Sequence, residues 1–86
     1  MEPMLVNEPI EILSKRFNDF PKSFLWRGQE HHVRAVDRCW TISRHNRLKA
    51  IRRQFFRVRT LNATYDLYRD LQRDTWYLNR VINNSG

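Results

Sequence analysis

The chain has 86 residues and carries sixteen Lys and Arg against nine Asp and Glu, a formal net charge of +7. This length allows one small hydrophobic core and excludes a second domain, so we expect a single domain over residues 8–83 behind an N-terminal tail of residues 1–7. There is no run of eighteen apolar residues and no basic stretch followed by an apolar one at the N-terminus, so neither a membrane span nor an export signal is predicted. Cys39 is the only cysteine, which fits a reducing compartment and predicts a cytoplasmic protein.

Strands joined by tight turns are expected along the first half of the chain. Apolar and polar residues alternate at the start of residues 10–14, which predicts a first strand. A second strand leads into Arg27 and Gly28, where glycine supplies the positive φ that a hairpin turn requires. Residues 29–43 are long for one strand, and their apolar positions change phase, which predicts a bulge or bend near residues 34–36.

The second half of the chain also has strand character, except in its basic middle. Residues 44–53 show no period-2 pattern, which leaves two alternatives: a long loop, or a short helical turn near residues 46–52. Residues 54–61 return to alternation, with apolar residues on one face and arginines on the other. Two further strands, near residues 64–69 and 75–82, are expected to pair as a hairpin.

These elements predict an all-β fold. Short strands and turns without an amphipathic helix favour a small twisted antiparallel meander, or an SH3-like or OB-like barrel, of five or six strands. In so small a core most aromatic rings must be structural, because each buries a large apolar area. Tyr68 and Tyr77 lie on the faces opposite Leu67 and Trp76, and we expect them to be the most exposed rings.

The basic charge favours a polyanionic partner. Thirteen of the sixteen basic residues are Arg, whose planar fork binds phosphate through two hydrogen bonds. The residues expected to contact nucleic acid are Arg44, Arg47, Lys49, Arg52, Arg53, Phe55, Arg57 and Arg59. The arginines would neutralise phosphates, and the interleaved Phe55 would stack on an unpaired base. A solvated basic surface with no ligand is the alternative for the same residues.

No pattern in the sequence predicts catalysis, a metal or a cofactor. His31 and His32 are adjacent, so on a strand they point to opposite faces and cannot both bind one ion. The sequence contains no glycine-rich phosphate loop, no Gly-x-Ser-x-Gly motif and no paired-cysteine zinc motif. We therefore expect a non-enzymatic module with no catalytic residue.

Several motifs occur in an order that resembles a known family. They are Glu8-Pro9-Ile10-Glu11, Phe24-Leu25-Trp26-Arg27-Gly28, Val33, Trp40, Phe56-Arg57-Val58, Tyr65-Asp66-Leu67-Tyr68 and Trp76-Tyr77-Leu78-Asn79-Arg80-Val81. Over residues 8–82 the chain resembles a small bacterial domain family of unknown function, found as stand-alone proteins and at the C-terminus of Y-family DNA polymerase-like proteins. The resemblance implies a setting in mutagenic DNA repair and carries over no catalytic residue. The basic residues of 44–53 are outside these motifs, so their DNA-binding role is a separate inference from their chemistry.

The leading hypothesis is a small cytoplasmic module that binds DNA or RNA. The alternative is an adaptor that docks a partner protein through a sheet edge or through exposed rings such as Tyr68 and Tyr77. The sequence leaves the oligomeric state open under both hypotheses.

Overall fold

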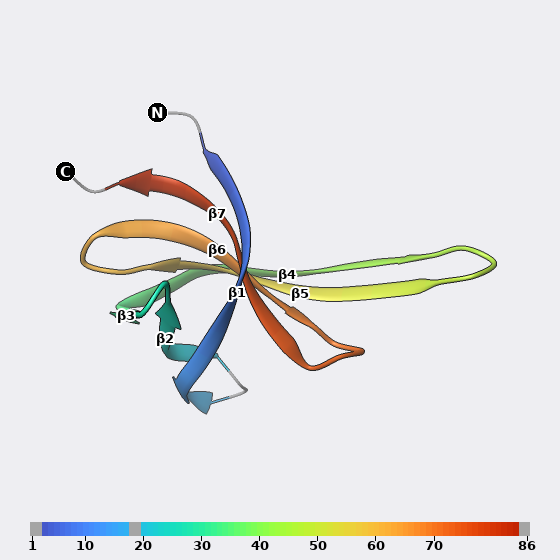
Figure 1. Ribbon diagram of the computed structural model, residues 1–86, viewed down its shortest axis with the longest axis horizontal. Helices are drawn as coiled ribbons and strands as arrows, with labels where there is room; N and C mark the ends of the chain where they lie inside the picture. Colours follow the sequence, from blue (N-terminus) through green and yellow to red (C-terminus); the bar gives the residue numbers. More distant parts are fainter. Residues whose placement is uncertain (1–2, 18–19, 85–86) are drawn as a thin grey trace.

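The computed structural model describes residues 3–17 and 20–84, and these residues form one antiparallel sheet without an α-helix. The strands are β1 (Met4–Lys15), β2 (Pro21–Trp26), β3 (Gln29–His32), β4 (Ala35–His45), β5 (Ala50–Arg59), β6 (Ala63–Asp70) and β7 (Thr75–Asn84). Their order in the sheet is β3-β2-β1-β7-β6-β5-β4, so β3 and β4 form the two edges (Figure 1). The predicted all-β class is confirmed, with seven strands where five or six were expected.

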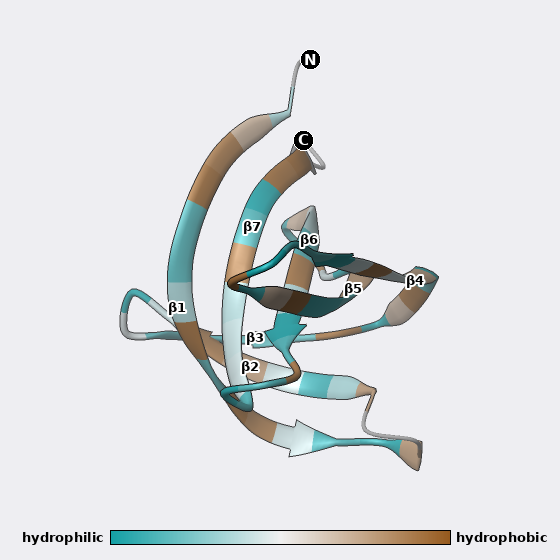
Figure 2. Ribbon diagram, turned by 90° about the vertical axis from the view of Figure 1, so that its right-hand side faces the viewer, coloured by the Kyte–Doolittle hydropathy of each residue, from teal (hydrophilic) through white to brown (hydrophobic). Residues whose placement is uncertain are grey.

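The core lies on one face of this sheet, which coils around it. Phe56, Leu67 and Leu78 point to that face from three adjacent strands and are completely buried. Phe20, just before β2, packs edge-on against Phe56 of β5 with ring centroids 5.7 Å apart, although these two strands are separated in the sheet by three others. Figure 2 shows the curvature, with β1 and β7 bending side by side. The sheet is therefore barrel-like but open at its edges.

Strand β1 joins the two parts of the sheet. Its first half pairs with β7 and its second half with β2. A register shift in the first half surrounds Asn7, whose φ of 54° is left-handed, a conformation that Asn adopts more readily than most residues. Residues 1–7 are predicted to be a tail, whereas β1 already begins at Met4, which pairs with Val81. Residues 4–7 are therefore part of β1, because β7 supplies backbone partners that the local sequence does not reveal.

The turn between β2 and β3 is as predicted. Arg27 and Gly28 have φ values of 51° and 76°, and positive φ at both central residues is the geometry of a type I′ hairpin turn. Residues 29–43, read as one strand with a bend, are two strands, β3 and most of β4. The predicted irregularity is present, because the pairing of β4 with β5 shifts register after Val36.

The structure corrects the interpretation of residues 44–53. Instead of a loop, or a helical turn near residues 46–52, the chain forms the far end of a long hairpin, in which β4 runs to His45 and β5 starts at Ala50. The Asn46 carboxamide oxygen closes the turn by accepting hydrogen bonds from the backbone N–H groups two and three residues later, both at 2.9 Å. Apolar and polar residues do not alternate here, because both faces of the hairpin end are largely exposed and neither face requires apolar residues.

The long hairpin makes the molecule elongated, with extents of 45 × 30 × 24 Å. None of the described residues belongs to a helix with the length and apolar character needed to cross a bilayer.

Candidate functional site

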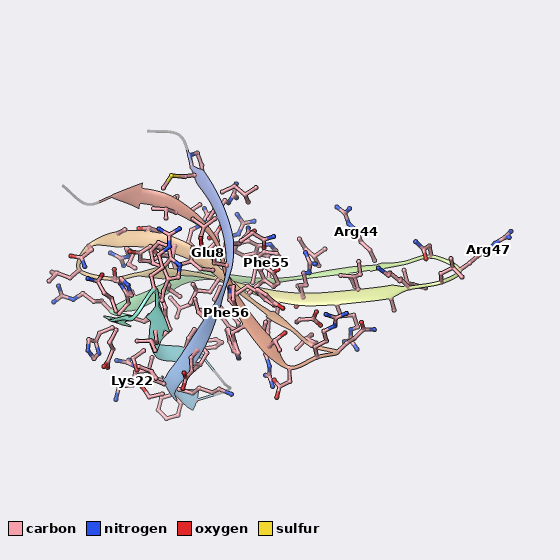
Figure 3. The ribbon with its side chains drawn as sticks, in the orientation of Figure 1. Glu8, Lys22, Arg44, Arg47, Phe55 and Phe56 are labelled. Atoms are coloured by element: carbon pink, nitrogen blue, oxygen red, sulfur yellow. The ribbon has the colours of Figure 1, made fainter. Side chains whose placement is uncertain are left out.

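The far end of the β4–β5 hairpin projects away from the body of the protein. β5 pairs with β6 only from Arg53 onwards, so residues 42–52 extend as a two-stranded ribbon, which we call the arm. Figure 3 shows Arg44 and Arg47 far from the rest of the molecule. Leu48, at the tip between two basic residues, is 92% exposed. The arm is therefore accessible from several sides.

The net charge of the protein comes from this hairpin. Eight of the sixteen Lys and Arg residues lie within residues 38–59, and no Asp or Glu occurs between Asp37 and Asp66. That segment carries +8, and the remainder of the chain, with eight basic and nine acidic residues, carries −1. The positive charge is thus segregated onto one projecting element, which concentrates its potential.

Acidic partners divide the predicted contact residues into two groups. Arg57 is held by Asp66, and Arg59 donates from Nε to Asp37 Oδ1 at 3.0 Å. Within the described part of the chain, the arm cations have no acidic group within 4 Å; they are Arg44, Arg47, Lys49 and Arg52. These four residues are available to an external anion, and so is Arg53 at the base of the arm, which likewise has no acidic group within 4 Å among the described residues.

Four aromatic side chains form a row across the sheet on the face opposite the core. Trp40 pairs in register with Phe55, Phe55 with Tyr68, and Tyr68 with Tyr77, one residue from each of β4 to β7. Their ring centroids are 5.2, 5.2 and 5.0 Å apart along the row. The spacing follows from the distance of about 4.8 Å between neighbouring strands, which brings side chains at paired positions face to face. We call these residues the aromatic row.

The aromatic row changes two expectations about exposed rings. Tyr68 points away from Leu67 as predicted, but it is only 4% exposed, because Phe55 and Tyr77 cover its two faces; Tyr77 is half-buried. Phe55, expected to stack on a base, is 7% exposed and lies between Trp40 and Tyr68. The faces of both buried rings are already occupied.

Arginines on the same side of the sheet complete the covering of the rings. The guanidinium carbon of Arg38 lies 5.1 Å from the Trp40 ring centroid, and that of Arg53 lies 4.8 Å from the Tyr68 ring centroid. Both distances are within the range of cation–π attraction. Burial raises the pKa of the Tyr68 phenol, so its hydroxyl remains protonated at neutral pH and donates a hydrogen bond to Asn7 Oδ1 at 3.1 Å. The row therefore packs continuously across the sheet at the base of the arm.

Asp66 anchors the sheet beside the aromatic row. It is completely buried and accepts hydrogen bonds from Arg57 Nε and Nη2 at 2.9 and 3.1 Å, and from Arg80 Nε at 3.0 Å. Such charge-assisted, two-pronged bonds fix the guanidinium geometry. Arg57 consequently has a structural role, in which it holds β5 to its neighbours in the sheet. Its spacing in the sequence does not reveal this role, because the pairing depends on the registers of three strands.

The two faces of the arm differ in chemistry. Arg44 and Ile51 point to the same side as the aromatic row, together with Arg53. The opposite side carries polar side chains, with Ser43 paired to Arg52 and Thr41, at the base of the arm, paired to Gln54. We call Thr41, Ser43, Arg52 and Gln54 the polar face. Of these four residues only Arg52 is predicted from the sequence, since Thr41, Ser43 and Gln54 stand out only once the register is known.

A groove lies between the arm and the turn that joins β6 to β7. It has a volume of about 510 Å³ and is lined on the arm side by Lys49 and Arg53 and on the turn side by Arg73. Asp70 also lines it, but one of its carboxylate oxygens accepts hydrogen bonds from the backbone N–H groups of the turn. Cations from two hairpins thus face one groove, an arrangement that suits a phosphate backbone.

The two adjacent histidines lie apart from this basic surface. His31 is buried with its ring stacked 5.1 Å from that of Phe24, whereas His32 is exposed. Burial lowers the pKa of His31 below its ordinary value of 6.5. Among the residues that the structure describes, there is no group of three His, Cys, Asp or Glu side chains that could hold a metal ion.

Comparison with known protein families shows to which family the chain belongs. The model of a domain of unknown function, DUF6504, matches residues 1–83. The chain belongs to the DUF6504 family. This match agrees with the resemblance to a small family of unknown function. No curated protein and no solved structure matches the chain significantly.

Proposed function

We propose that the protein is a non-enzymatic module that binds nucleic acid through the arm, in the cytoplasm and in the DNA-repair setting that the family resemblance implies. The observation that carries the proposal is the segregation of charge, with +8 in residues 38–59 and −1 in the remainder. A basic protein that needs charge only for solubility would gain as much from a dispersed distribution. The lone Cys39, which forms no internal disulfide, fits the reducing cytoplasm.

The arm supplies a countable set of phosphate contacts. Arg44, Arg47, Lys49 and Arg52 have no acidic partner in the described part of the chain, and Arg53 adds a cation in the groove. Each phosphate that they neutralise releases condensed counterions, which changes the slope of log affinity against log salt by about −0.9 on duplex DNA. Four or five contacts predict a slope of about −4. Arg57 and Arg59 add little, because carboxylates already bind them.

The test is fluorescence anisotropy of labelled single-stranded and duplex DNA at several salt concentrations. The variant replaces Arg44, Arg47 and Arg52 with Ala; the matched control replaces three exposed basic residues away from the arm, Arg16, Lys22 and Arg34. Both triple variants remove the same charge. The arm variant should bind more weakly, with a slope that is flatter by about 2.7, whereas the control should retain the slope. Equal losses in both variants would mean that only net charge matters and would refute the proposal.

A protein-interaction adaptor is the second candidate, and the free edge of β4 favours it. β4 is an edge strand of eleven residues, and an unpaired edge can accept a strand from a partner. Arg38 and Arg44 on this strand oppose pairing with another basic chain. Binding of a defined partner that survives nuclease treatment and high salt would favour the adaptor over the nucleic-acid module.

A further inference from the structure

Stacking on unpaired bases is poorly supported by the geometry of the rings. Single-strand binders offer open aromatic faces on which bases stack. Here the faces of Phe55 and Tyr68 are covered by their neighbours in the aromatic row, and Arg38 and Arg57 lie over the Trp40 ring. Apart from Leu48 at its tip, the accessible surface of the arm is cationic and polar, so it suits a nucleic acid whose bases are already stacked in a duplex.

The dimensions of the arm match one groove of B-form DNA. Its two strands lie about 4.8 Å apart, and the four residues 42–45 alone extend roughly 13 Å at about 3.3 Å per residue. The major groove, about 12 Å wide and 8.5 Å deep, admits a two-stranded ribbon, whereas the minor groove is only about 6 Å wide. The arm is narrow enough to lie along the floor of the major groove with one of its faces towards the bases. The deep, narrow major groove of A-form RNA would exclude it.

The polar face carries side chains that can form hydrogen bonds with the edges of bases. Arg52, which is exposed, can donate two hydrogen bonds to guanine O6 and N7. Gln54 is half-buried and already donates from Nε2 to Cys39 Sγ at 3.8 Å, so Arg52 is the residue on this face that is free to contact a base. Ser43 and Thr41, directly across the ribbon from them, are short enough to let the backbone approach the bases. Arg44, on the other face, is placed to meet a phosphate that flanks the groove.

We infer that the arm inserts into the major groove of double-stranded DNA, with Arg52 on the polar face contacting guanine. The inference rests on the proposed function and adds to it the type of nucleic acid, the groove and the residue that reads the base. The backbone contacts come from the opposite face, so affinity and base recognition are carried by different arginines of one hairpin.

Two base analogues distinguish binding in the major groove from binding in the minor groove, because each removes one hydrogen-bonding group from one groove. Replacing guanine with 7-deazaguanine in a G·C-rich duplex removes the N7 acceptor from the major groove, and replacing it with inosine removes the amino group from the minor groove. The protein should bind the 7-deazaguanine duplex at least about fivefold more weakly than the parent duplex, and the inosine duplex equally well. It should also bind the parent duplex more tightly than its separated strands.

Two exposed arginines on opposite faces of the arm provide matched variants. Arg52→Ala should bind the 7-deazaguanine and parent duplexes equally, because the contact to N7 is already lost. Arg44→Ala should retain the discrimination and flatten the salt slope by about 0.9. Far-UV circular dichroism checks that both variants keep the sheet.

The outcomes distinguish this inference from the proposed function. Tighter binding to single strands, sensitivity to inosine instead of 7-deazaguanine, or discrimination that survives Arg52→Ala would overturn the groove assignment and leave nucleic-acid binding intact. Absence of binding to any DNA at low salt would overturn both.

Discussion

Replacing the buried carboxylate of Asp66 tests whether its ion pairs with Arg57 and Arg80 stabilise the sheet beneath the arm. Asp66→Asn keeps the shape of the side chain and one acceptor oxygen but removes the charge that faces Arg57 and Arg80. Three hydrogen bonds, at 2.9, 3.1 and 3.0 Å, converge on this carboxylate. In the variant, the side-chain NH2 group of Asn has to face at least one guanidinium group. Both groups are hydrogen-bond donors, so no hydrogen bond can form between them.

The expected cost follows from the burial of the partners. Breaking a buried ion pair by removing one charge costs about 3–5 kcal/mol. The Asp66 side chain is fully buried, but the side chains of Arg57 and Arg80 retain 27% and 39% exposure, so water compensates part of the loss. We expect the free energy of unfolding to fall by about 3 kcal/mol, the low end of that range. For a domain of this size the melting temperature should fall by about 12–24 °C.

Urea and thermal unfolding followed by circular dichroism measure this change. Asp37→Asn is the matched control, because it breaks a pair with Arg59 in which the two side chains are 38% and 57% exposed. Exposed pairs contribute about 0–1 kcal/mol, so the control should unfold almost as the wild type does. If both variants lost the same stability, the buried cluster would not be a framework element and the reasoning would be wrong.

Three further predictions concern titration and packing. Burial lowers the pKa of His31, so the unfolded chain takes up the proton more readily and the free energy of unfolding should fall as the pH drops below about 6.5. Urea midpoints at pH 7 and 5 should show this fall, and the fall should be smaller in His31→Gln; an equal fall in that variant would contradict the assignment. Hydrogen bonds, first from Arg27, lower the pKa of Glu8 to about 2. NMR titration should find the Glu8 midpoint there, and Arg27→Ala should move it towards 4.5; a low midpoint in both proteins would contradict the assignment. Phe56→Ala in the fully buried centre should lower the free energy of unfolding by about 3–5 kcal/mol, and a loss below 1 kcal/mol in a urea titration would show that the core repacks.

Strand prediction succeeded where one face of a strand meets the core. Residues 54–61, 64–69 and 75–82 alternate because Phe56, Leu67 and similar residues must be buried while their neighbours are not. The same reasoning failed for residues 44–53. These form a strand pair whose two faces are largely exposed, so hydrophobic burial leaves no period-2 signal in the sequence.

The sequence by itself determines the β class, the turn at Arg27 and Gly28, and the concentration of basic residues in the middle of the chain. These features depend on local backbone preference, alternation and composition. They define a basic surface without showing which of its charges are free. The prediction of nucleic-acid contact could therefore name candidate residues but could not rank them.

Only the tertiary structure decides which of those residues an external partner can reach. The strand registers set Arg57 against Asp66 and stack Phe55 in the aromatic row, so both become framework, whereas Arg44 and Arg52 remain open on opposite faces of the arm. The physical reason is that contacts across a sheet join residues far apart in sequence. A shift of one residue would exchange the two faces of a strand.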